Sequence, residues 1–81
     1  MVSDYTGFEV KVDNDDGTVT MLPLETVKVY DVTNEEELDD LTSDAEGLIA
    51  PGSLDVDAGT LIRFSVQRVD GISGYADQLT T

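Results

Sequence analysis

Hydrophobic and polar residues alternate with a period of two over several short segments of this chain. Between residues 7 and 13, apolar side chains occupy every second position, which predicts a strand with one buried face. The dipeptide Asp16-Gly17 then gives a strong hairpin signal. Residues 18–22 are β-branched or apolar and predict a second strand, so we expect residues 7–22 to form a hairpin.

Two further segments have the same period. In residues 25–32, Val27 and Val29 share one face, while Tyr30 lies on the other with Lys28. Tyrosine at such a position suits either a partner interface or the edge of a sandwich. Residues 60–69 form the clearest strand, with three apolar side chains on one face: Ile62, Phe64 and Val66.

The segments between these strands are less decisive. Residues 33–41 fit either one capped helical turn or a loop followed by a short strand. Residues 43–47 predict a turn with Gly47 in a left-handed conformation. Short apolar strands are expected near residues 48–50 and 54–57, and residues 75–81 fit either an edge strand or a loose tail.

Strands at this spacing predict an all-β protein, a small single-domain antiparallel β-sandwich of six to seven strands over residues 1–81. The chain shows no internal repeat, linker or low-complexity tract. Residues 1–6 and 75–81 lie outside the strongest strands, and we expect them to serve as docking arms.

Charge changes this picture. Eighteen acidic residues, twelve of them aspartate, face four basic residues, for a net charge of −14. Such self-repulsion opposes compaction, so the chain is either disordered or adapted to strong salt. The 40% of hydrophobic residues favours folding. Aspartate-rich, lysine-poor composition is typical of halophilic proteins; an ordinary acidic protein is the alternative.

Composition also narrows the chemistry. The chain has no histidine and no cysteine, which removes the commonest general base, the thiol nucleophile and most zinc ligand sets. We expect no enzyme, no cofactor and no catalytic residues. The acidic balance disfavours nucleic acid and anionic membranes as partners. A structural cation such as calcium is the remaining metal hypothesis, with Asp13, Asp15 and Asp16 as candidate ligands beside the alternative of simple turn formation.

One stretch resembles a known family. Residues 27–32 form a valine-x-valine strand, Thr42-Ser-Asp-Ala-Glu-Gly47 forms a turn motif, and Gly59-Thr60 opens an alternating strand. This order resembles the transthyretin-like, or carboxypeptidase regulatory-like, β-sandwich family over about half of the chain. The hairpin at residues 7–22 departs from the family pattern. The resemblance implies a non-catalytic scaffolding or adhesion module.

These observations lead to an expected function. We expect a structural protein of a virion, such as a capsid decoration, turret, fibre or tail module of a halophilic tailed virus. Its partners would be protein subunits of that assembly, or further copies of the chain in an oligomer. The alternative is a soluble or cell-surface module that binds a protein or a carbohydrate. Residues 1–4 lack a basic region and a hydrophobic run, so the virion is the expected location and the cytoplasm or cell surface the alternative.

Overall fold

The computed structural model describes residues 2–68, 71 and 73–81, and this part of the chain contains strands, turns and loops but no helix. The predicted all-β class is therefore confirmed. Eleven short strands account for 52% of the described residues. They are β1 (Ser3–Tyr5), β2 (Phe8–Glu9), β3 (Lys11–Asp13), β4 (Val19–Met21), β5 (Thr26–Asp31), β6 (Glu36–Glu37), β7 (Leu41–Thr42), β8 (Leu48–Ile49), β9 (Gly52–Leu54), β10 (Leu61–Gln67) and β11 (Ser73–Leu79).

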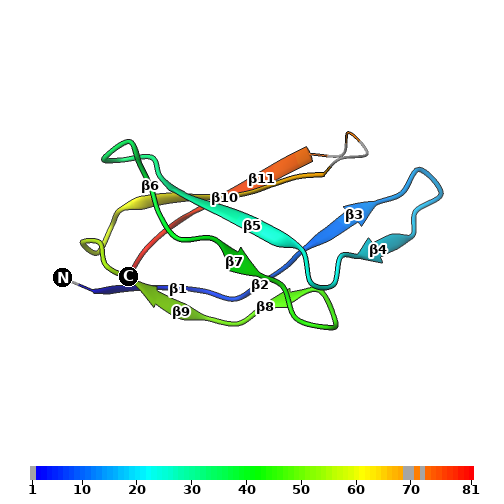
Figure 1. The fold of residues 1–81 in the computed structure, drawn as a ribbon, viewed down its shortest axis with the longest axis horizontal. Coiled ribbons are helices and arrows are strands. Elements are labelled where there is room, and N and C mark those ends of the chain that lie inside the picture. The colour runs from blue at the N-terminus through cyan, green and yellow to red at the C-terminus, as the bar shows by residue number, and fades with distance from the viewer. Residues whose placement is uncertain (1, 69–70, 72) are drawn as a thin grey trace.

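The largest sheet has five antiparallel strands in the order β11-β10-β5-β6, with β7 also paired to β5. It forms the upper layer in Figure 1. Its two long inner strands match the predictions for residues 25–32 and 60–69, although Val69 lies outside the described residues. The alternation is also confirmed, because Val27, Val29, Ile62 and Phe64 are buried.

The second layer is assembled from three two-stranded ladders: β1–β9, β2–β8 and β3–β4 (Figure 1). The predicted strand over residues 7–13 changes partner at Val10, which donates to the Gly47 carbonyl and accepts from the Leu22 N–H. Gly7 lies where the chain bends between β1 and β2. A Cβ at Gly7 would come within 2.8 Å of the Ile49 carbonyl oxygen, so this close approach requires glycine.

The two layers are joined along one side, at the end that holds both termini (Figure 1). Asp4 and Thr81 exchange two backbone hydrogen bonds of 2.9 and 3.0 Å. Next to them, the Gln78 side-chain amide accepts from the Thr6 N–H at 2.8 Å and donates to its carbonyl at 3.3 Å. Residues 75–81 therefore contain an edge strand rather than a loose tail, and residues 3–5 belong to β1. Docking by either segment stays a prediction.

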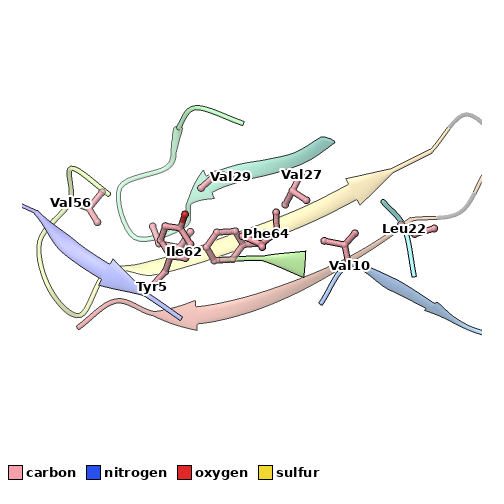
Figure 2. Close-up of a cluster of buried hydrophobic side chains, with 9 residues drawn as sticks. Tyr5, Val10, Leu22, Val27, Val29, Val56, Ile62 and Phe64 are labelled. Carbon is pink, nitrogen blue, oxygen red and sulfur yellow. The ribbon is translucent and has the colours of Figure 1, made fainter. Parts of the chain in front are cut away.

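The core lies between the layers and is centred on Ile62 and Phe64 (Figure 2). The Phe64 ring packs against Phe8 at a centroid distance of 4.7 Å and against Tyr5 at 5.5 Å. Leu22, at the end of the second strand predicted from the sequence, is also buried. It lies opposite Val10 in the β3–β4 ladder, and residues directly opposite each other share a face.

In residues 33–41 the structure shows a turn and the short strand β6, with β7 beginning at Leu41, and no helical turn. The buried Asp31 carboxylate accepts hydrogen bonds from the Asn34 N–H at 2.9 Å and from its side-chain amide at 2.7 Å. Glu35 takes a positive φ of 54°. The chain therefore turns directly from β5 into β6. The polar residues here would also suit the N-terminal cap of a helix, but in this structure they close a turn between two strands.

Candidate binding groove

The two layers separate at the end opposite the termini, where the β3–β4 and β10–β11 hairpins both extend (Figure 1). Between them lies a groove of about 420 Å³, bounded by residues 8–13 on one side and 73–76 on the other. Its floor is apolar and includes Phe8, Val10, Val12, Leu22, Val27, Phe64, Val66 and Ala76. Figure 2 shows three of these side chains, Val10, Leu22 and Phe64, as members of the buried hydrophobic cluster.

The first rim of the groove is the outer side of β2 and β3. The backbone groups of Val10 face β8 and β4, as its bonds to Gly47 and Leu22 show. Successive residues of a strand direct their N–H and C=O groups to opposite sides. The alternate rim residues therefore direct their backbone groups away from β8 and β4, toward the groove: Glu9, Lys11 and Asp13.

The second rim is the free edge of β11. The Thr60 carbonyl accepts from the Thr80 N–H, so the even-numbered residues of β10 face β11. Their register partners Gly74, Ala76 and Gln78 face back toward β10. The alternate residues direct their backbone groups outward: Ser73, Tyr75, Asp77 and Leu79. Thr81 follows the same alternation and uses this side to bond Asp4.

Between these two rims, no strand of the described residues pairs with the far side of β11 along residues 73–79. The edge also lacks the usual protection against pairing, since its register with β10 runs without a bulge over seven residues and contains neither proline nor lysine. This absence of protective residues is the one sequence signal that could have indicated an open edge. The groove itself depends on contacts between distant segments.

The outer face of the large sheet is ordered by a charged cluster beside the groove. Arg63 donates from Nε and Nη2 to the two carboxylate oxygens of Asp77 at 2.9 and 3.0 Å. Its guanidinium carbon also lies 4.2 Å from the centre of the Tyr75 ring. The hydrogen bond from Arg63 lowers the pKa of Asp77 and raises that of Arg63. Tyr75 is thereby held in place although its residue is 66% exposed.

Tyr30 lies on this same outer face, half-buried and opposite Glu37 in the register of β5 and β6. Lys28 on the same face pairs with Asp40 at 3.2 Å, and Arg68 pairs with Glu25 at 3.1 Å. Three of the four basic residues are therefore engaged by acids of the same chain.

The candidate calcium ligands lie at the tip of the β3–β4 hairpin. Asp13 ends β3, and Asp15 and Asp16 belong to the following turn. The Asp16 carboxylate accepts from the Thr18 hydroxyl at 2.6 Å and from its N–H at 3.0 Å, and these bonds lower its pKa. No group of three or more acidic side chains in the described ranges converges as a metal site would require. The carboxylate of Asp16 is used in closing the turn, and calcium binding stays a prediction.

The turn motif at residues 42–47 folds as the sequence predicted. The Asp44 carboxylate accepts from the N–H groups of Leu48 at 2.9 Å and Glu46 at 2.8 Å, and these bonds lower its pKa. Gly47 adopts the expected positive φ, 82°. A Cβ there would also lie 3.1 Å from the Leu22 nitrogen. The motif therefore shapes a turn, and membership of the transthyretin-like family stays a prediction.

Comparisons with protein families, with curated proteins and with solved structures found no match to this chain. The described residues include no helix with the length and apolar character to cross a membrane. Fold and groove together define an all-β protein, compatible with a β-sandwich, in which the unpaired edge of β11 lies beside a groove with an apolar floor.

Proposed function

We propose that this chain is a non-catalytic structural protein of a larger assembly, specifically a virion component of a halophilic tailed virus. Within a virion, we propose the role of a capsid decoration, a turret or fibre module, or a tail module. The observation that carries the proposal is the open edge of β11 along residues 73–77, on the side away from its seven-residue ladder with β10. Such an edge is suited to permanent contact with another protein chain.

The charge distribution supports a setting of strong salt. With a net charge of −14, the chain repels itself over about 10 Å in dilute salt, and molar salt reduces this range to about 3 Å. Screening of this kind also weakens ion pairs between subunits. Backbone hydrogen bonds and apolar contacts keep their strength, and these are the contacts that the β11 edge and the groove offer.

Mass spectrometry of particles purified by density gradient from a culture that expresses this gene tests the proposal. We expect the chain to sediment with the capsid proteins at a fixed stoichiometry and to stay bound after washing in 2 M KCl. Its exclusive recovery in the fraction that contains no particles would contradict a virion role.

A second function, a soluble or cell-surface module that binds a protein or a carbohydrate, rests on a different surface. A depression of about 820 Å³ on the outer face of the large sheet is bordered by Lys28, Ser65 and Tyr75. The exposed Tyr75 ring suits stacking against a sugar. A monomer in size-exclusion chromatography that binds a glycan, with loss of binding in Tyr75→Ala, would favour this reading.

A further inference from the structure

We propose that the groove receives one extended segment of a partner protein as an additional strand between β11 and β3. The segment has apolar residues at alternate positions and neutral or basic residues between them. This inference rests on the proposed function only for its partner, a protein of the same assembly.

The two rims supply the backbone groups for such a strand. β11 directs the N–H and C=O groups of Ser73, Tyr75 and Asp77 outward, and the opposite rim directs those of Glu9 and Lys11 toward it. An extended peptide carries donors and acceptors on both of its sides. A single inserted strand can therefore bond to both rims, whereas addition to an ordinary sheet edge uses only one side.

The floor of the groove selects the side chains of the segment. Phe8, Val10 and Val12 project from one layer, and Phe64 and Ala76 from the other. In an extended strand every second side chain points to the same face, so alternate apolar residues would fill this floor. The open part of β11 spans residues 73–77, which corresponds to about 17 Å, or five to seven residues of the incoming segment.

The net charge of the chain and the position of its terminal segments indicate that the inserted segment comes from a different protein. A second copy would bring another charge of −14 against the first, and on the rim itself Glu9 and Asp13 outnumber Lys11. The terminal segments of this chain are engaged at the opposite end, where Asp4 bonds Thr81. A neutral or basic segment of a partner satisfies the rims without this repulsion.

The test uses three fluorescein-labelled nine-residue peptides with valine at alternate positions and lysine, threonine or glutamate at the others. Fluorescence anisotropy with the full chain measures binding in 0.15 M and 2 M KCl. We expect the lysine peptide to bind at least tenfold more tightly than the glutamate peptide in 0.15 M KCl. We expect the threonine peptide to bind at both salt concentrations, because its contacts are backbone and apolar.

Two variants locate the binding site. Tyr75→Pro removes an N–H that points into the groove while leaving the bonds to β10, and Ala76→Gln places a long polar side chain over the floor. Each should weaken binding of the threonine peptide at least tenfold. Val19→Pro is the matched control, since its N–H points outward from the far edge of β4. Circular dichroism shows that each variant keeps its strand content.

The outcomes separate this inference from the proposed function. Absence of binding by all three peptides overturns the inference, and so does equal binding by folded Tyr75→Pro and Val19→Pro. If the chain is then found in particles, it docks by another surface and the virion role stands. Peptide binding with the chain absent from particles supports strand insertion and refutes the virion role.

Discussion

Ser43 offers the sharpest test of how the two layers are held in register. Its residue is 1% exposed, directly follows the strand β7 and lies against the turn at residues 22–25. The Ser43 hydroxyl donates to the Leu22 carbonyl at 2.6 Å and accepts from the Glu25 N–H at 2.8 Å. One side chain therefore satisfies two backbone groups of the connection that leads from the second layer into the large sheet.

Ser43→Ala removes both bonds and leaves a carbonyl and an N–H without their partner. A buried unsatisfied polar group costs about 1–3 kcal/mol. Two such groups, with partial hydration of the half-buried Glu25, give an expected loss of about 2–4 kcal/mol in the free energy of unfolding. For a domain of this size 1 kcal/mol corresponds to about 4–8 °C in Tm, so a loss of about 2–4 kcal/mol lowers Tm by roughly 8–32 °C.

Thermal unfolding followed by circular dichroism in 2 M KCl measures this loss. Ser53→Ala is the matched control, because Ser53 is exposed and its hydroxyl makes one surface hydrogen bond, to Asp4 at 2.8 Å. We expect the control to change stability by less than about 0.5 kcal/mol. If both variants unfold within a few degrees of the unmodified protein, the two bonds at Ser43 do not stabilise the fold as argued.

Three further predictions concern salt, pH and the core. Raising KCl from about 0.1 M to about 2 M should raise Tm by several degrees, because the salt screens the net charge of −14. A Tm that does not change with salt concentration would contradict adaptation to strong salt. The bond from Arg63 lowers the pKa of Asp77 below its ordinary value of 3.8, so its stabilisation is present above that pH and is lost as the pH falls through the folded-state pKa. The Tm difference between the unmodified protein and Asp77→Asn should therefore be present at pH 7 and shrink below about pH 3.8; a constant difference would contradict this. Ile62→Ala at a fully buried position should lower the free energy of unfolding, measured in urea, by about 2–5 kcal/mol. Leu24→Ala at a 72% exposed position should lower it by less than about 0.5 kcal/mol. Similar losses in the two variants would contradict the position of the core at Ile62.

The strands and their buried faces could be predicted because they depend on local order along the chain. Alternation assigned Val27, Val29, Ile62 and Phe64 to the core, and all four are buried. The turn signals at Asp16-Gly17 and at residues 43–47 were also correct, since both glycines adopt the positive φ that such turns require. The charge of −14 is a property of composition alone.

Burial of polar groups could not be predicted in this way. Asp31 continues the face of Val27 and Val29, yet a carboxylate in that position is tolerated only because Asn34 donates two hydrogen bonds to it. Ser43 was recognised as part of a turn motif, but its bonds to Leu22 and Glu25 depend on a different turn packing beside it.

The sequence by itself determined the class of fold, the buried face of each main strand and the net charge, because period, turn chemistry and charge are local or additive properties. Only the tertiary structure decided which strands pair, where the layers join and where they part. Asp4 and Thr81 come from opposite ends of the chain, and their hydrogen bonds join the two layers at one end of the molecule. At the other end, the layers remain separated between residues 8–13 and 73–76, which border the groove. Pairing of this kind is long-range, so no short segment of sequence encodes the groove.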